Sequence, residues 1–485
     1  MSRIVSALAL VTAAALFHSK NATAADINWS GYYRIEAVDI HGPELNSAQN
    51  QKAYFLHHMV LSPKIVAGDG LTIYGRFDLL NNSGFGQNNQ LGEFFGAGPR
   101  NDNSFDVGNY VPKSNSRHAG NSNVLSRAQA SGTVAVTQLY GVWNQEFGSV
   151  IVGRVPMQFG LGVVHNAGTG AFDHYFESKD IVAYKAVLGN IFVMPMIGKV
   201  SEGDLGNEDD VNDYMVHVQY DNPETDLTLG VFFEQRVGTS AGNDIPISGS
   251  SAVGATAPNG FKSQLFSVFV KQRAGNFHIG VEGDFLSGDT GAQTASGQNV
   301  SANGFGLAAD VSYKPEDSRF SAGVKLGLAS GDDPNTADTN EGFSFNRNYD
   351  VAFLLFNHPM GQYDVLRTGL VRGTTIPASS QPDTEALSNA LFFAPNVDFK
   401  LRDNLLLNGT IAYAMLNKEP VVNGSTDKSL GFEVDVGVTY KPFERLTWKS
   451  QLGALIPGGA WRGSGIQTYE NRVAYGFETK AAISF

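Results

Sequence analysis

The sequence predicts an all-β protein: a single transmembrane antiparallel β-barrel of about 18 strands (16–18), with long outer loops and short periplasmic turns. Three observations support this prediction. The chain ends on residues 472–485, where aromatic and aliphatic residues alternate with charged and small ones. The same period of two recurs along the chain, as half-buried strands require. No segment after the amino terminus offers 18 consecutive apolar residues, so no transmembrane helix is expected.

The first 24 residues (1–24) are expected to be a signal peptide. Arg3 supplies the basic start, residues 4–17 are mostly apolar, and Ala22-Thr23-Ala24 is a small-x-small cleavage site. The apolar run is shorter than the roughly 20 residues that a membrane-spanning helix needs. Residues 25–485 are then expected to form the barrel as one domain.

Most alternating segments are about ten to fourteen residues long, close to the 9–11 of a tilted membrane-spanning strand. The candidate segments lie near residues 27–38, 53–66, 70–81, 132–147, 149–159, 180–188, 190–201, 212–221, 226–238, 261–274, 276–287, 303–315, 319–330, 348–357, 364–373, 387–402, 404–417, 429–441, 445–457 and 472–485. Residues 348–373 are best explained as a hairpin inside a loop. Because an even number is expected, we predict 18 strands.

Short turns, such as residues 315–318 and 442–444, join some neighbouring segments, and long loops join others. This asymmetry is typical of bacterial outer-membrane barrels. A soluble β-sandwich or β-helix shows the same alternation, but charges of both signs on the polar face and the terminal Phe485 favour a water-filled lumen. The last strand must then pair with the first to remove both sheet edges. Candidate residues of the aromatic girdles are Tyr313, Tyr413, Tyr440 and Trp448.

The composition excludes several classes of function. The chain has 47 acidic and 34 basic residues, a net charge of −13 and no cysteine. Nucleic-acid binding is not expected, because it needs a basic surface. The lack of cysteine excludes disulfides, thiolate metal sites and lipid attachment at an amino-terminal cysteine. No H-E-x-x-H or P-loop motif occurs, and we expect neither an enzyme nor a cofactor.

The polar faces of the strands should point into the lumen, because a basic residue that faces lipid at the membrane midplane costs about 2–4 kcal/mol. The candidates for lumen charges that set selectivity are Arg76, Asp78, Arg154, Lys199, Glu234, Arg236, Lys271, Arg273, Glu282, Asp284, Asp310 and Lys325. Further inward charges are expected at Arg34, Glu36, Lys314, Asp398, Lys400, Glu433, Asp435, Lys449, Glu478 and Lys480. These charges either pair across strands and stiffen the wall, or form a selectivity ladder for a polar or charged solute.

One connection, residues 81–130, is unusually long and rich in Gly, Asn, Ser and Asp. Loops longer than about 15 residues are usually functional or disordered. The connection follows the third strand, as does the constriction loop of general porins, and we expect it to narrow or plug the lumen. Its basic candidates are Arg100, Lys113, Arg117 and Arg127.

The acidic segment 331–341 is a weak candidate for a calcium site through Asp332, Asp333 and Asp338. Carboxylate oxygens suit calcium, but their order departs from the D-x-[DN]-x-[DN]-G loop. A solvated outer loop is the favoured interpretation, and no other metal site is expected.

Two segments resemble the alginate-export-type outer-membrane barrels. Residues 328–346 (LASGDDPNTADTNEGFSFN) are similar to their strand-to-loop S-G-D segment, and residues 152–162 (VGRVPMQFGLG), followed by Phe172-Asp173, are similar to their G-R…G…F-D pattern. The resemblance implies an 18-stranded barrel whose lumen basic residues guide an anionic polysaccharide outward. Arg154 would be such a residue, and Asp332 and Asp333 would lie in an outer loop.

These observations predict a porin-like channel in the cell outer membrane for the passive passage of polar or charged solutes. Two alternatives are an exporter pore for an anionic polysaccharide and a structural barrel that anchors an envelope complex. Expected partners are outer-membrane lipid, lipopolysaccharide and, for the exporter, periplasmic secretion proteins. The terminal aromatic residue resembles the signal that the barrel-assembly machinery reads.

Overall fold

A computed structural model of the chain describes residues 26–47, 50–80, 93–94, 134–201, 210–238, 260–294, 297–333, 335–362, 365–366, 385–419, 427–462 and 470–485. Its strands are β1 (Asp26–His41), β2 (Gln51–Gly68), β3 (Leu71–Leu79), β4 (Glu93–Phe94), β5 (Val134–Gln145), β6 (Gly148–Pro156), β7 (Ser178–Leu188), β8 (Ile191–Ser201), β9 (Val211–Asn222), β10 (Leu227–Gly238), β11 (Phe261–Ala274), β12 (Phe277–Gln293), β13 (Asn299–Tyr313), β14 (Phe320–Ala329), β15 (Thr339–Asn340), β16 (Ala390–Arg402), β17 (Leu405–Leu416), β18 (Ser429–Phe443), β19 (Leu446–Pro457) and β20 (Ala474–Ser484). A short 3-10 helix, η4 (Gly459–Trp461), follows β19. No described helix is long and apolar enough to cross a membrane.

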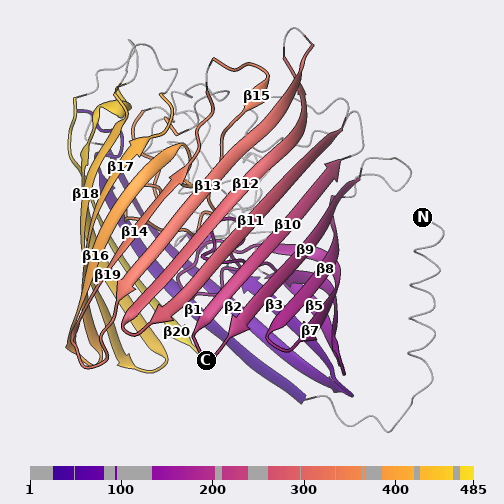
Figure 1. Cartoon of the computed structure of the whole chain (residues 1–485). Helices are drawn as coiled ribbons and strands as arrows, with labels where there is room; N and C mark the ends of the chain where they lie inside the picture. Colours follow the sequence, from indigo (N-terminus) through magenta and orange to yellow (C-terminus); the bar gives the residue numbers. More distant parts are fainter. Residues whose placement is uncertain are drawn as a thin grey trace, which may run out of the picture.

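The strands close a single antiparallel barrel (Figure 1). β4 and β15 contain only two residues each, so the barrel wall consists of the 18 longer strands in the described part of the chain. β1 pairs with β20 from Tyr32–Ser484 to His41–Tyr475, which confirms the predicted closure and the predicted count. Closure matters because it leaves no sheet edge with unpaired backbone groups in the lipid.

Gly31 allows the chain to close tightly at its carboxyl terminus. Its N–H donates to the carbonyl of Phe485 at 3.1 Å and its carbonyl accepts the N–H of Phe485 at 3.0 Å. A Cβ at residue 31 would lie 2.9 Å from the Phe485 ring. Because the same Cβ would also lie close to the carbonyl oxygen of Val60, only glycine leaves room here for both the neighbouring strand and the terminal aromatic ring.

The two faces of the wall differ as the alternation predicts. Large apolar side chains are exposed on the outside, including Val436 and Leu452 at 60% each and Phe477 at 42%. On β20, Phe477 alternates with the buried Glu478, which lies on the inside. An apolar outer belt around a closed barrel is the surface that a lipid bilayer solvates.

The connections differ at the two ends of the barrel (Figure 1). Short turns, such as residues 189–190 and 403–404, lie at the end that also carries Phe485. Longer connections join the strands at the opposite end. This arrangement matches the predicted pattern, so the turn end is taken as the periplasmic end and the loop end as the outer end.

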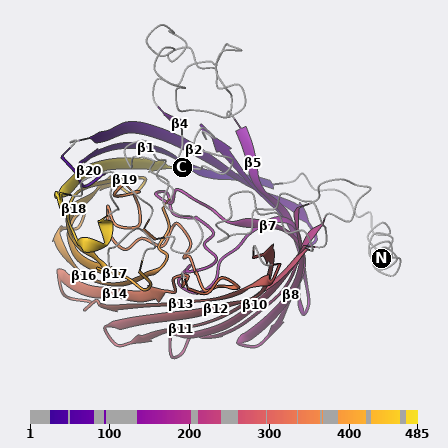
Figure 2. The ribbon, with the colours of Figure 1, turned by 90° about the horizontal axis from the view of Figure 1, so that it is seen from above.

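Two of the outer connections turn into the barrel (Figure 2). The first inner loop is residues 157–177, and the second inner loop is the described part of residues 330–389. Residues 351–356 of the second inner loop are buried in a hydrophobic core with wall residues such as Phe392 and Leu455. Each such side chain contributes about 1.5–3 kcal/mol when it is fully buried. The described residues between 348 and 362 contain no strand, so they lie in a loop outside the barrel wall, as predicted, but they do not form the first strand of the hairpin predicted for residues 348–373.

The signal-peptide prediction for residues 1–24 lies outside the described residues. Most of the long connection 81–130 also lies outside them, including Arg100, Lys113, Arg117 and Arg127. Its described residues, β4, pair with Leu56 and His57 of β2. At that point the chain follows the barrel wall.

Candidate constriction site in the lumen

The first inner loop folds back on itself between the outer ends of β6 and β7. Its two ends are joined by a backbone hydrogen bond of 3.0 Å from Met157 N to Glu177 O. The ring of Phe159 is buried against Phe232 of β10, with 5.6 Å between ring centroids. The loop is therefore attached to the wall by both its backbone and its apolar side chains.

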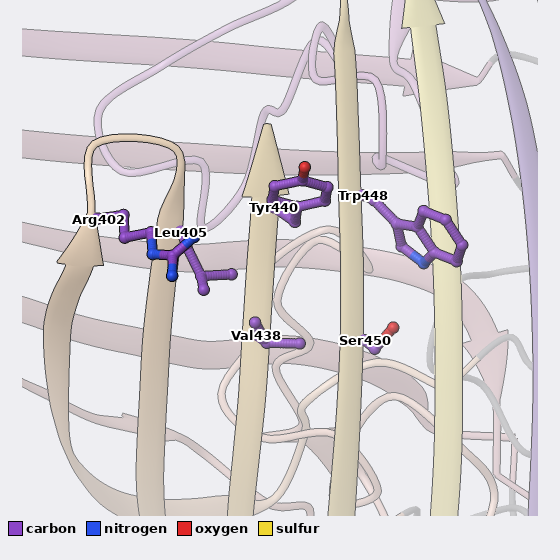
Figure 3. Close-up of a pocket in the computed structure, with 6 residues that line it drawn as sticks. All are labelled: Arg402, Leu405, Val438, Tyr440, Trp448 and Ser450. Carbon is purple, nitrogen blue, oxygen red and sulfur yellow. The ribbon is translucent and has the colours of Figure 1, made fainter. Parts of the chain in front are cut away.

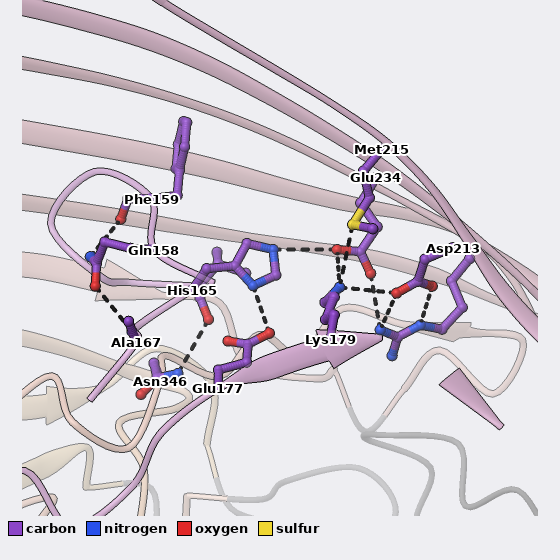
Figure 4. Close-up of polar contacts among 12 residues, drawn as sticks. Gln158, Phe159, His165, Ala167, Glu177, Lys179, Asp213, Met215, Glu234 and Asn346 are labelled. Carbon is purple, nitrogen blue, oxygen red and sulfur yellow. Dashed lines mark hydrogen bonds and ion pairs between the residues drawn. The ribbon is translucent and has the colours of Figure 1, made fainter. Parts of the chain in front are cut away.

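His165 connects this loop to a network of charges on the wall (Figure 4). Its Nδ1 lies 2.7 Å from the Glu177 carboxylate, and its Nε2 lies 3.3 Å from the Glu234 carboxylate of β10. The network continues along the wall through Lys179 to Glu234 (2.6 Å) and Asp213 (3.0 Å), and through Arg236 to Asp213 (2.7 Å) and Glu234 (3.0 Å). Burial lowers the pKa of His165, but the carboxylates of Glu177 and Glu234 outweigh it and raise the pKa to about 9. The ring is therefore cationic at neutral pH.

The tip of the first inner loop is held by β11 and β12. The Glu282 carboxylate accepts the N–H of Leu161, and Lys271 Nζ donates to the carbonyl of Gly160 at 2.5 Å. Gly160 has a positive φ of 45°, and a Cβ there would collide with the Glu282 carboxylate. Only glycine fits this backbone conformation at this distance from the wall.

Two wall arginines hold the other side of the same loop. Arg76 Nη1 donates to the carbonyl of Gly168 at 2.9 Å, while its Nε lies 3.1 Å from the Asp78 carboxylate. Arg34, which is fully buried, donates to the carbonyl of Asp173 at 2.8 Å. These two inward arginines hold the loop, because each donates a hydrogen bond to one of its backbone carbonyls.

The second inner loop is held by a pair of wall carboxylates on β18. Glu433 accepts the N–H of Leu354 at 2.5 Å and the N–H of Leu355 at 2.7 Å. Asp435 accepts the N–H of Phe353 at 3.1 Å. Three consecutive backbone donors are thereby satisfied in a buried place where no β-ladder serves them.

The two inner loops bond to each other across the lumen. The backbone N–H of Tyr175 donates to Asn348 Oδ1 at 3.1 Å, and Asn348 Nδ2 donates to the carbonyl of Tyr175 at 2.6 Å. Asn346 N donates to the carbonyl of Val163 at 2.6 Å. The loops therefore form one connected layer, which narrows the passage between the two mouths of the barrel.

Lysines face this layer from the wall. Lys449 of β19 and Lys480 of β20 are register partners, and both approach the ring of Phe172, at 4.8 and 5.6 Å from its centroid. Lys325 of β14 donates to the carbonyl of Asp350 at 2.7 Å. Lys449 is exposed to the lumen and has no ion pair in the described part of the chain, so its charge is available to a solute.

Ten of the predicted selectivity residues point into the lumen as expected: Arg76, Asp78, Glu234, Arg236, Lys271, Arg273, Glu282, Asp284, Asp310 and Lys325. Most of them hold the wall or the loops together. Asp310, for example, accepts the hydroxyl of Tyr349 at 2.8 Å, and Arg273 pairs with Glu316 at 2.9 Å near the turn end. Their inward orientation agrees with the prediction, and their part in selectivity stays a proposal.

Two predicted lumen residues, Arg154 and Lys199, lie on the outer face of the barrel, and the prediction for them is wrong. Arg154 has the orientation of Val152, which is 47% exposed, and forms a double hydrogen bond with Asp180 at 2.8 and 2.7 Å. Lys199 has the orientation of Ile197 and pairs with Asp210 at 2.5 Å. Both lie near the outer ends of their strands, where a charge avoids the cost that it would have at the membrane midplane.

The weak calcium candidate gains no support. The side chain of Asp333 pairs with Lys418 at 2.9 Å, which lowers the pKa of Asp333 to about 2. Asp332 accepts the N–H of Glu341 at 3.1 Å, and Asp338 lies exposed nearby. Among the described residues, no group of three carboxylate or histidine side chains is arranged to hold a metal ion.

The roles of both inner loops were not predicted from the sequence. Only one signal was present: residues 351–356 form a continuous apolar run, which breaks the alternation that most lipid-facing strands show, although residues 191–197 of the wall strand β8 form such a run too. The carboxylates Glu433 and Asp435 were predicted to face inward, but nothing in the sequence indicates that their partners are backbone N–H groups.

No family model matches the sequence, and no curated protein matches it. Solved structures share the fold. OccK9 (OpdG) of Pseudomonas aeruginosa is 11% identical over 95% of this chain and 98% of that chain, with a TM-score of 0.51. OpdK of the same organism, solved with vanillate, is 12% identical over 95% and 98%, with a TM-score of 0.50. OpdQ is 8% identical over the same shares, with a TM-score of 0.50.

Proposed function

We propose that this protein is a porin-like channel of the cell outer membrane, through which small polar or charged solutes diffuse passively. The observation that carries the proposal is the layer formed by the two inner loops, bonded to each other through Asn348 and Tyr175 and to charged wall residues. A barrel that only anchored other proteins would not need a polar, charged layer inside it. The fold shared with OpdK and OccK9 supports the same proposal.

We infer that small organic anions pass more readily than cations of the same size. Lys449 offers positive charge beside the ring of Phe172, whereas the neighbouring Lys480 is paired with Glu478 at 2.9 Å. The site therefore has one partner for a carboxylate, Lys449, and one for an apolar or aromatic group, Phe172. OpdK was solved with vanillate, which is an aromatic carboxylate. Vanillate is therefore a suitable first probe for this chain.

The exporter alternative receives less support than the channel. The resemblance to alginate-export-type barrels assigned the guide role to Arg154, and this residue lies on the outer face in an ion pair with Asp180. The alternative of a structural barrel depends on a plugged lumen. The connection predicted to form that plug, residues 81–130, lies almost entirely outside the described residues. Lipopolysaccharide and the barrel-assembly machinery stay predicted partners.

Planar-bilayer recordings of the purified full-length chain test the proposal. We expect single-channel steps, a preference for anions and a reduction of the current when vanillate is added. A protein that inserts into the bilayer without conducting would overturn the channel. A channel that conducts but prefers cations and ignores vanillate would overturn the inference about organic anions and leave the channel itself standing.

A further inference from the structure

The outer face of the barrel carries a groove at its turn end (Figure 3). It has a volume of about 470 Å³ and is lined by Arg402, Leu405, Val438, Tyr440, Trp448 and Ser450. These residues belong to β16, β17, β18 and β19, so the groove crosses four neighbouring strands. It is separate from the lumen, because Tyr440 and Trp448 are exposed on the outside at 41% and 48%.

The sizes of the side chains that pair across the strands explain why the outer surface has a groove here. Val438 is the register partner of Ser450, and Tyr440 is the register partner of Trp448. Val438 and Ser450, which have the smaller side chains, lie further from the turn end than the rings of Tyr440 and Trp448. They form the floor of the groove. Trp448 Nε1 donates to Thr479 Oγ1 at 2.7 Å, which holds the indole over β20 and away from Tyr440.

A bulge brings a positive charge to the same place. The pairing of β16 with β17 shifts between Lys400 and Arg402, so that Arg402 faces Leu405. Strict alternation would have put Arg402 on the lumen side with Lys400, and the extra residue, Leu401, turns it outward. In the described part of the chain Arg402 has no ion pair, whereas Lys400 pairs with Asp403 at 3.0 Å.

We propose that this groove binds a glycerophospholipid of the periplasmic leaflet, with the lipid phosphate on Arg402 and an acyl chain over Val438 and Leu405. The guanidinium matches a phosphate in charge and in hydrogen-bond geometry. The aromatic rings have the amphipathic character found at membrane interfaces. The groove lies beside the turn at residues 403–404, at the level where the headgroups of that leaflet are expected. The proposal depends on the membrane location of the barrel and not on what the lumen conducts.

Native mass spectrometry of the full-length chain in mild detergent, with phosphatidylglycerol as the probe, tests this proposal. We expect the wild type to retain one lipid and Arg402→Gln to retain it about tenfold less, the loss of one charge-assisted hydrogen bond. Val438→Phe fills the floor and should lower retention while it keeps the charge. Lys400→Gln is the matched control, because it removes one positive charge on the lumen side of the same strand and should retain the lipid.

Equal retention by the wild type, Arg402→Gln and Val438→Phe would overturn the proposal. An equal loss in Lys400→Gln and Arg402→Gln would also overturn it, because only general electrostatic attraction would remain. A protein dimer that disappears in Val438→Phe would assign the groove to a second copy of the chain instead. Bilayer conductance of Arg402→Gln should equal that of the wild type, which separates this site from the channel.

Discussion

The carboxylate of Glu433, on the barrel wall, accepts the backbone N–H of Leu354, on the second inner loop, over 2.5 Å. Both residues are fully buried. The second carboxylate oxygen accepts the next N–H along the chain, that of Leu355, at 2.7 Å. An inward-facing acidic residue that a sequence pattern would assign to solute selection thus holds the loop that narrows the lumen.

Replacing Glu433 with alanine should loosen the second inner loop and raise single-channel conductance. The change leaves the N–H groups of Leu354 and Leu355 without their acceptor, and each such hydrogen bond contributes about 0.5–1.5 kcal/mol. Single-channel recordings would show larger or noisier steps. Glu444→Ala, in the turn between β18 and β19, is the control and should leave the steps unchanged. Identical steps in the two variants would contradict the role of Glu433.

Replacing Lys449 with glutamine should shift ion selectivity toward cations. Lys449 is exposed to the lumen, and its Nζ lies 4.8 Å from the centre of the Phe172 ring. Losing one unit charge at contact distance in water changes an ion's energy by roughly 1 kcal/mol, so the permeability ratio should change about fivefold. The reversal potential in a salt gradient measures the ratio. Lys441→Gln is the control. It changes the net charge equally at the exposed turn end of β18 and should leave the permeability ratio unchanged.

Replacing Arg154 with glutamine should change neither conductance nor selectivity. The guanidinium lies on the outer face, where it pairs with Asp180 at 2.7 Å, and its side chain is 49% exposed. Recordings of this variant beside Lys449→Gln compare an outer and an inner cation directly. A selectivity shift in Arg154→Gln as large as that in Lys449→Gln would restore Arg154 as a guide residue of the pore.

The stability of the barrel should fall as the pH rises from about 6.5 to about 9, through the titration of His165. The folded-state pKa is raised above its ordinary value of 6.5, so the contribution is complete below the unfolded pKa and is lost above about 9. The size of this contribution is about 3 kcal/mol. The temperature at which the folded band disappears in heat-modifiability gels reports it across that pH range.

His165→Gln should flatten that pH dependence, because glutamine does not titrate. The matched control is His278→Gln, on β12 and away from the network of Glu177 and Glu234. This control should keep the wild-type profile. A wild-type barrel whose unfolding temperature rises across the same range would contradict the assigned charge of His165.

Much of the fold was predictable, because a lipid-facing strand must alternate and a closed barrel must join its ends. The alternation of residues 472–485 predicted both the outward Phe477 and the inward Glu478, and the pairing of β1 with β20 followed from closure. The rule that sends charges inward failed at Arg154 and Lys199, because it applies at the membrane midplane and both residues lie near the strand ends. At Arg402 a bulge reset the alternation, and a single sequence does not reveal a bulge.

The constriction was less predictable, because it depends on contacts between segments far apart in the chain. The prediction placed it in residues 81–130, on the analogy of a loop after the third strand. The described structure builds it from residues 157–177 and from the second inner loop, which meet through Tyr175 and Asn348. Hydrogen bonds from backbone groups to wall carboxylates, such as Leu354 to Glu433, leave no composition signal in either partner.

Thiol modification of Asp350→Cys in planar bilayers tests most directly whether the inner loops line the conducting path. The chain contains no cysteine, so the introduced thiol is the only target. Asp350 is exposed on the second inner loop, where its carbonyl accepts a hydrogen bond from Lys325 at 2.7 Å. A bulky methanethiosulfonate reagent should reduce the current of this variant and leave that of Phe477→Cys, on the lipid face, unchanged. An Asp350→Cys channel that is labelled by the reagent and still carries its full current would contradict the account.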